Sequence, residues 1–214
     1  MSTSPSQSTS TKVSNAIGQF ALETLSAWLV EARTRGWLRL DPRDGARVWP
    51  EELHYALDLG DEFTAIGALT PSDSDRTGDL WAHCWRHIEA ALSDGDSLAE
   101  RWWSLSRRLR LPDESLQLLA LLVASAASTP LSRAFRYAWA DFGRQTMPLG
   151  FASLLLAVNS PEDGDVSELL DGRGPRAAEP LRCRGLVELS DAELPGASAA
   201  EVGLRVPSDV VAWL

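Results

Sequence analysis

The chain has 214 residues, 44% of them hydrophobic and 23% charged, which fits a globular protein with one good core or two small ones. Its net charge of −10 argues against nucleic acid as a partner, because affinity for the phosphate backbone comes largely from cationic side chains. Two isolated cysteines, no secretory leader and no run of ~20 apolar residues predict a cytoplasmic protein with free, buried thiols and no membrane association.

The chain is predicted to begin with a flexible tail and a helix. Residues 1–12 are almost all Ser, Thr, Pro and Gln, a composition that buries too little apolar surface to become ordered. From residue 13 to 35 the apolar residues follow helical spacing, and Gly36 is a typical helix end. We therefore expect a disordered tail at 1–12 and a helical N-terminal region over 13–108.

Three more helices are predicted in this region. Pro50 and the two glutamates after it are typical of a first helical turn and favour a short helix over 50–57. After a linker rich in Pro, Ser, Asp and Gly, an apolar stripe predicts a helix over 80–92. Asp96 or Ser97 is positioned to cap the next helix, which carries the sequence "LAERWWSLSRRL".

The middle of the chain is predicted to hold its most buried helix. Pro112 can start the segment "DESLQLLALLVASAA", which is apolar nearly all round. Thr129 and Pro130 repeat the cap-and-proline signal and open another helix, with Gly143 as its C-terminal glycine. Thr146 is expected to cap a further helix, "MPLGFASLLLAV".

The letters "DFG" at 141–143 are also found in protein kinases. A kinase needs in addition a glycine-rich loop, a strand lysine and a catalytic-loop Asp, and a P-loop enzyme needs G-x-x-x-x-G-K-[ST]. None of these patterns occurs in the sequence. We therefore interpret the triplet as a helix end.

The last fifty residues change character. A short helix near 165–171 and a helical turn over "EPLRCRG" are followed by two short strands, "LVELS" and "EVGLRV", and by a closing helix, "PSDVVAWL". The predicted fold class is mainly α, a multi-helix domain with a winged-helix-like C-terminal part over 109–214 that carries a short two-stranded antiparallel hairpin. Small α+β domains share this plan.

The order of motifs in this part resembles the N-terminal winged-helix region of AAA+ ATPases encoded with contractile injection systems. The matching segments are "LRLPDESLQLLALLVAS", "FRYAWADFGRQTMPLGFASLLLA", "PLRCRGLVEL" and "VGLRVPSDVVAWL". The resemblance implies a non-catalytic module that precedes an ATPase core. The chain departs from the family pattern at Pro112 to Ser115, and it stops at Leu214 instead of continuing toward Walker motifs, so we expect either the leading part of a longer ATPase or a stand-alone relative.

The sequence "HCWRH" places His83 and His87 on one face of a helix, where they could supply two ligands of a zinc site. A third ligand would come from elsewhere, for example His54 or an acidic residue. The HExxH pattern with its general base is absent. The alternative is a pair of helix-surface histidines, and we expect no cofactor or metal.

Candidate partner-binding residues come from tryptophans and arginines. Trp102 and Trp103 are neighbours, so on a helix they point about 100° apart and at most one can sit at the centre of a narrow buried face. The alternative is a broad buried face that holds both. The arginines that could face a protein partner, such as an AAA+ ring or an injection-system component, are Arg107, Arg108, Arg136 and Arg144.

No catalytic motif is found, and the chain is expected not to be an enzyme. The predicted function is a protein-interaction or regulatory domain that acts with, or leads, an AAA+ ATPase of a contractile injection system. The alternative is a winged-helix DNA-binding transcriptional regulator, in which Arg182 and Arg184 would lie near the DNA.

Overall fold

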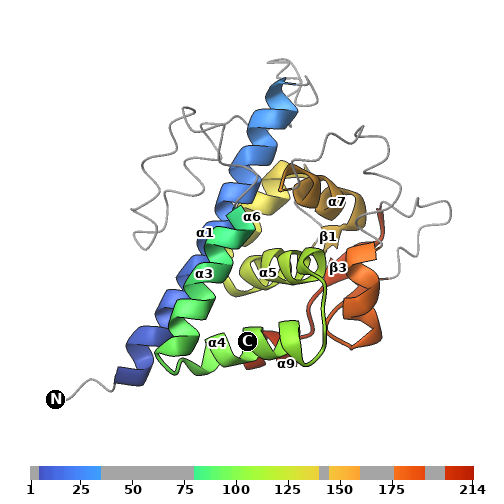
Figure 1. The fold of residues 1–214 in the computed structure, drawn as a ribbon. Helices are drawn as coiled ribbons and strands as arrows, with labels where there is room; N and C mark the ends of the chain where they lie inside the picture. The colour runs from blue at the N-terminus through green and yellow to red at the C-terminus, as the bar shows by residue number, and fades with distance from the viewer. Residues whose placement is uncertain (1–4, 35–79, 140–144, 160–175, 191–200) are drawn as a thin grey trace.

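The computed structural model describes residues 5–34, 80–139, 145–159, 176–190 and 201–214. Helices make up most of this part of the chain, and a small antiparallel sheet lies at one side (Figure 1). The predicted mainly helical fold class is therefore confirmed. The elements are α1 (Pro5–Thr34), α3 (Leu80–Ser93), α4 (Ser97–Arg107), α5 (Asp113–Ala127), α6 (Thr129–Ala138), β1 (Met147–Pro148), α7 (Leu149–Val158), a helix at 176–183, β2 (Glu188–Ser190), β3 (Gly203–Arg205) and α9 (Ser208–Trp213).

The first helix is longer than predicted. It begins at Pro5, eight residues before the predicted start at residue 13. A helix can extend beyond its last apolar contact because each added residue contributes another backbone hydrogen bond. Helix α1 runs antiparallel to α3: Lys12 Nζ, near its start, lies 3.8 Å from Asp94 Oδ2, just after the end of α3.

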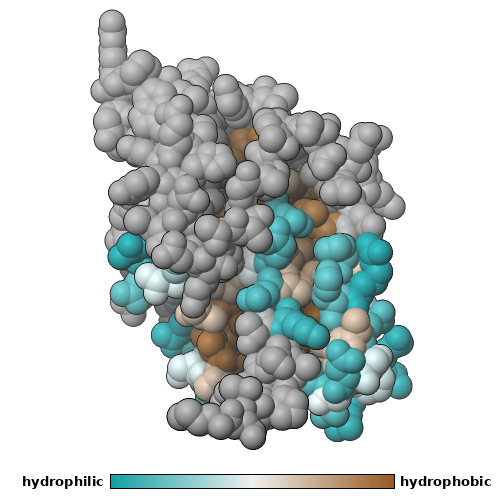
Figure 2. All heavy atoms as spheres, turned by 90° about the vertical axis from the view of Figure 1, so that its left-hand side faces the viewer, coloured by the Kyte–Doolittle hydropathy of each residue, from teal (hydrophilic) through white to brown (hydrophobic). Residues whose placement is uncertain are grey.

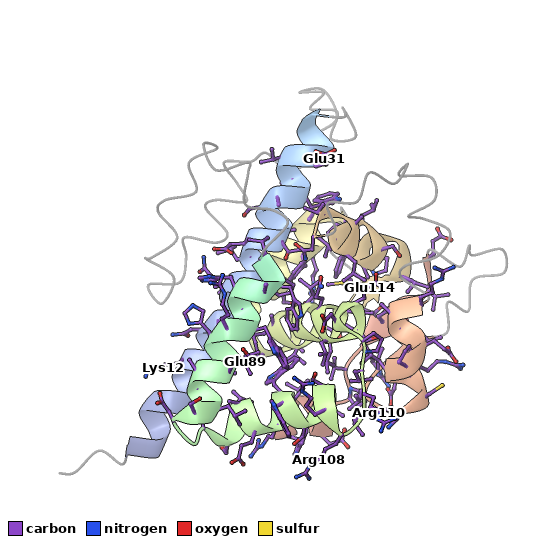
Figure 3. All side chains as sticks on the ribbon, in the orientation of Figure 1. Lys12, Glu31, Glu89, Arg108, Arg110 and Glu114 are labelled. Carbon is purple, nitrogen blue, oxygen red and sulfur yellow. The ribbon has the colours of Figure 1, made fainter. Side chains whose placement is uncertain are left out.

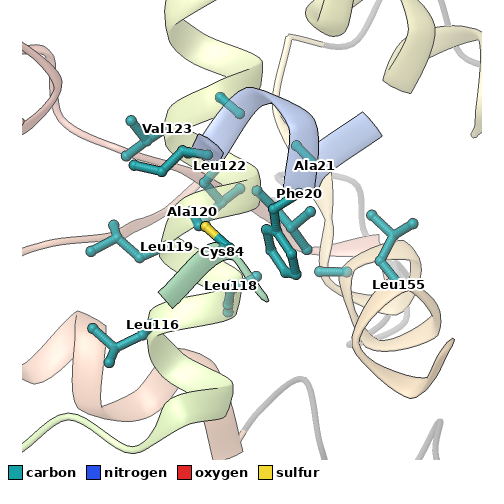
Figure 4. Packing of buried hydrophobic residues seen from close by; sticks show 14 of the residues in the cluster. Phe20, Ala21, Cys84, Leu116, Leu118, Leu119, Ala120, Leu122, Val123 and Leu155 are labelled. Atoms are coloured by element: carbon teal, nitrogen blue, oxygen red, sulfur yellow. The ribbon is translucent and has the colours of Figure 1, made fainter. Parts of the chain in front are cut away.

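The central helix is α5, as predicted. Every residue from Ser115 to Ala124 is buried, because α5 is covered by helices from several sides. Figure 4 shows Phe20 of α1 and Cys84 of α3 next to α5, with Leu155 of α7 on the far side of Phe20, and all belong to one buried cluster. An almost wholly apolar sequence is what such a position requires.

The core is shared between the two regions that were predicted from the sequence. Buried residues before and after the predicted boundary at 108/109 belong to one cluster. The Phe151 ring of α7 makes edge-to-face contacts with Trp28 of α1 and Trp139, with ring centroids 5.0 and 5.7 Å apart. The N-terminal helix is therefore part of the scaffold that supports the C-terminal half.

One buried polar contact also joins these regions. Asn159 Nδ2, at the end of α7, donates a hydrogen bond of 3.0 Å to Thr24 Oγ1 in α1, and both residues are buried. A buried amide without its partner loses solvation without compensation. The contact therefore orients α1 against α7 more specifically than apolar packing does.

Replacement of Thr24 by Val should test this contact. We expect Thr24→Val to lower the free energy of unfolding by about 1–3 kcal/mol, because the shape is retained while the Asn159 amide loses its acceptor. Urea denaturation of Thr24→Val, Asn159→Ala and the double variant measures the coupling between the two side chains. Additive effects would show that the hydrogen bond does not contribute.

The sheet has three strands in the order β1-β3-β2, all antiparallel. The predicted hairpin is confirmed, since Leu189 of β2 pairs with Leu204 of β3. The strand β1 was missed: Met147 and Pro148 were assigned to a helix capped by Thr146, but they pair with Leu204 and Gly203, and α7 begins at Leu149. A two-residue strand has no pattern of its own and exists because β3 pairs with it.

The helix ends agree in part with the sequence. Asp96 caps α4, with its Oδ1 accepting a hydrogen bond of 2.7 Å from the Leu98 amide. At α6 the cap is Ser128 and not Thr129, because Ser128 Oγ accepts from the Leu131 amide at 3.4 Å. The predicted helices at 50–57 and 165–171, the triplet at 141–143 and His54 lie outside the described residues.

Candidate protein-interaction surface

The two adjacent tryptophans of α4 differ in their exposure to solvent. Trp102 is 0% exposed and belongs to the core, whereas Trp103 is 36% exposed. A helical step of 100° turns one side chain inward and the next toward solvent. Trp102 is therefore a core residue, and Trp103 is the one that remains accessible to a partner.

The outward side of α4 and the turn after it carry several arginines. Arg107, Arg108 and Arg110 are exposed, and Arg101 is partly exposed. None of the four forms an ion pair with a carboxylate within the described part of the chain. Figure 3 shows Arg108 and Arg110 near the end of α4, where the chain turns toward α5. We call the set Arg101, Trp103, Arg107, Arg108, Arg110 and Trp213 the α4 arginine surface.

The C-terminal helix completes this surface. Arg101 Nη1 donates a hydrogen bond to the backbone carbonyl of Trp213, and its guanidinium lies 5.9 Å from the centroid of the indole ring. Trp213 is nevertheless 43% exposed. An arginine over an aromatic face gains a cation–π attraction while the other face of the ring stays open. Arg101 thus holds Trp213 in place without burying it.

The turn between α4 and α5 is held in an uncommon conformation. Arg110 has a φ of 50°, in the left-handed region that non-glycine residues rarely adopt. Such a residue costs about 1–2 kcal/mol relative to its relaxed conformation. Leu111, the next residue, is buried. The turn therefore anchors an apolar side chain and keeps the adjacent guanidinium in solvent.

The other predicted arginines are not part of this surface. Arg136 belongs to α6 and is half-buried, and its Nε is buried without a hydrogen-bond partner among the described residues. Arg144 lies outside the described residues. Arg101 and Trp213 were not predicted as partner-binding residues. No local pattern in the sequence predicts that Trp213 lies next to Arg101 of α4, because the two residues are 112 positions apart.

His83 and His87 lie on the exposed side of α3, with their Nε2 atoms 3.2 Å apart. Cys84, between them in sequence, is buried. Within the described ranges, no group of three or more His, Cys, Asp or Glu side chains is arranged to hold a metal ion.

Neither thiol is activated as a nucleophile. Burial, together with the charge of Glu23, raises the pKa of Cys84 to about 12. Cys183 was predicted to be buried but is exposed, and its hydrogen bond to the Glu179 carboxylate raises the pKa of its thiol. A thiol with a raised pKa stays protonated and reacts slowly. Both cysteines are free, as predicted.

Two arginines near the hairpin, Arg182 and Arg205, are paired with carboxylates, whereas Arg184 is exposed. Arg182 donates two hydrogen bonds to Glu179, at 2.9 and 3.0 Å, and this pairing lowers the pKa of the Glu179 carboxyl. Arg205 Nη2 of β3 lies 2.6 Å from Glu188 Oε2 of β2, so these two side chains form an ion pair. Guanidinium groups bound to carboxylates are less available for phosphate groups. The face around the hairpin therefore has less free positive charge than its sequence suggests.

The side of the molecule formed by α1 and α3 is mainly polar where it is described. Figure 2 shows hydrophilic residues over most of that area, with hydrophobic ones visible in the gaps between them. No helix among the described residues is by itself long and apolar enough to span a membrane. Helices α5 and α6 together are long and apolar enough, but the pair is bent by 111°.

No family model, curated protein or solved structure matches the chain.

Proposed function

We propose that this chain is a non-catalytic protein-interaction module that acts with, or as the leading part of, an AAA+ ATPase of a contractile injection system. The observation that carries the proposal is the α4 arginine surface, where guanidinium groups that form no ion pair with a described carboxylate lie near two exposed tryptophans. Tryptophan and arginine are the residues most enriched at binding hot spots.

The order of the C-terminal elements supports a winged-helix-like part. Strand β1 precedes α7, the helix at 176–183 follows, and β2 and β3 form the hairpin. The last strand lies in the middle of the sheet, between the first and the second. Winged-helix domains have this arrangement, with the hairpin as the wing. Together with the motif order, it supports the link to modules that precede AAA+ cores.

The chemistry of the surface favours an acidic partner. The chain carries a net charge of −10, so the local cluster of four arginines differs in sign from the molecule as a whole. Guanidinium groups bind carboxylates with paired hydrogen bonds, and opposite charges speed the encounter of two proteins. We therefore propose that the partner presents aspartate and glutamate side chains around an apolar contact for Trp103 and Trp213.

Charge reversal on α4 should test this proposal. The immobilised chain, with an affinity tag at its N-terminus, is expected to retain a ring ATPase from a lysate of the producing cells at native salt. Arg107→Glu combined with Arg108→Glu should reduce the retained ATPase at least tenfold, because two attractive contacts become repulsive. Arg133→Glu is the matched control for Arg107→Glu alone, since each reverses one exposed charge and Arg133 lies on α6 and not on α4.

Two results would contradict the proposal. One is retention of the ATPase by the double variant at the level of the unchanged chain. The other is a loss with Arg133→Glu equal to the loss with Arg107→Glu alone, which would show that only net charge matters. Circular dichroism of each variant should remain unchanged, since all three residues are exposed.

A DNA-binding regulator remains the second candidate because of the winged-helix-like order of elements. The pairing of Arg182 with Glu179 and of Arg205 with Glu188 weighs against it. Binding to duplex DNA with an affinity that falls steeply with salt would favour this candidate over the protein-interaction module.

A further inference from the structure

Two imidazole rings meet on the outer side of α3. His83 and His87 are one helical turn apart, and their ring centroids lie 4.7 Å from each other. Their Nε2 atoms, at 3.2 Å, form the closest approach. At this distance one ring can donate its Nε2–H to the Nε2 of the other, and a metal ion bound by both nitrogens would also fit the separation.

The separation suits a metal ion. Zinc–imidazole bonds are about 2.0–2.1 Å long, so two of them that end on nitrogens 3.2 Å apart meet at about 103°. The tetrahedral angle is about 109°. The distance between the two nitrogens therefore already suits a shared metal ion. We propose that His83 and His87 form a bidentate chelate for a divalent transition-metal ion, with water in the remaining coordination positions.

The surroundings define the type of ion. Two imidazoles suit Zn²⁺, Ni²⁺ and Cu²⁺, whereas Mg²⁺ and Ca²⁺ require oxygen ligands. Cys84 is buried, about 100° around α3 from His83, and the Glu89 carboxylate accepts a hydrogen bond of 3.0 Å from the Trp85 indole. Within the described residues no third ligand of the usual types joins the pair. The site is therefore open, and its affinity should follow the Irving–Williams order, with Cu²⁺ bound most tightly.

Metal binding would connect two successive turns of α3. The chelate forms only when this segment is helical, because the two imidazoles face each other only at helical spacing. A ligand that binds only the folded state stabilises it. The expected consequence is a more stable α3, independent of the partner proposed for the α4 arginine surface.

Titration of the purified, metal-free chain of 214 residues tests the proposal. Isothermal titration calorimetry with Cu²⁺, Ni²⁺ and Zn²⁺ should show one equivalent bound, tightest for Cu²⁺, and Mg²⁺ should give no signal. His83→Gln and His87→Gln should each lower the Cu²⁺ affinity at least tenfold, and the double variant should lose little more than either single one. The thermal midpoint should rise with added Ni²⁺ in the unchanged chain and not in the double variant.

The remaining histidine supplies the control. His54→Gln should leave affinity and stoichiometry unchanged if the site consists of His83 and His87. The proposal is overturned if the double variant still binds one equivalent with the original affinity, or if no metal binds at millimolar concentration. An equal loss of affinity with His54→Gln would overturn the assignment of two ligands.

Discussion

Trp102→Ala is expected to lower the free energy of unfolding by about 3–5 kcal/mol, while Trp103→Ala should change it by no more than about 0.5 kcal/mol. Trp102 is 0% exposed and is among the largest fully buried side chains described. Its removal leaves a cavity that the neighbouring helices can fill only in part. Chemical denaturation of the two variants, followed by circular dichroism, measures the difference.

A third substitution separates the polar part of the Trp102 effect from its volume. Trp102 Nε1 is buried and has no hydrogen-bond partner among the described residues. An unsatisfied buried donor costs about 1–3 kcal/mol, and Trp102→Phe removes that donor. We therefore expect Trp102→Phe to destabilise the protein much less than Trp102→Ala. Equal losses would show that the indole N–H is satisfied in solution.

Trp102→Ala and Trp103→Ala also test the proposed partner-binding surface. Trp103→Ala should weaken the retention of the partner ATPase while stability stays unchanged, since Trp103 is exposed beside Arg107 on the outer side of α4. Trp102→Ala should affect binding only as far as it unfolds the chain. Partner binding that is unaffected by Trp103→Ala would remove this residue from the proposed surface.

Gly203→Ala should also be strongly destabilising, by about 1–3 kcal/mol or more. Gly203 lies in β3 between Pro148 of β1 and Ser190 of β2. An added Cβ would overlap the hydroxyl oxygens of Thr146 and Ser190 and would lie 2.7 Å from Thr146 Cβ. The three strands can pair closely here because the middle strand, β3, has no side chain at Gly203.

Gly185→Ala provides a control for Gly203→Ala. Gly185 has a φ of 69° and open space around it, so its replacement should cost about 1 kcal/mol through the backbone alone. Combining Gly203→Ala with Thr146→Gly and Ser190→Ala should recover part of the stability, relative to the Thr146 and Ser190 changes alone. The same two changes should give no recovery with Gly185→Ala. Thermal denaturation of the set measures both effects, and equal recovery in both backgrounds would contradict the proposed overlap.

The sequence correctly predicted the features that depend on neighbours along the chain. The apolar stripe of α3, the all-round apolar character of α5 and the Asp96 cap were each predicted from residues within a few turns of one another. Periodicity and capping are local properties, since a helix brings residues three and four apart together whatever surrounds it. The two strands of the hairpin were predicted for a similar reason.

Other features of the fold depend on distant contacts. Strand β1 exists because Met147 meets Leu204, and the core unites α1 with α7 because Thr24 meets Asn159, 135 residues away. Neither partner can be identified from local pattern or composition. The early start of α1 was missed for the opposite reason, because composition indicated disorder where a helix continues beyond its apolar stripe.

In the candidate surface, too, some features follow from local sequence and others from distant contacts. The sequence alone predicted that arginines at the end of α4 could bind a partner. It also predicted that at most one of the two adjacent tryptophans could lie at the centre of a narrow buried face. Only the tertiary structure decided that Trp102 is buried and Trp103 exposed, and that Arg101 holds the penultimate residue, Trp213, at the surface. The physical reason is that the direction of the core, and the proximity of residues 112 positions apart, are set by the packing of whole helices and not by any short segment.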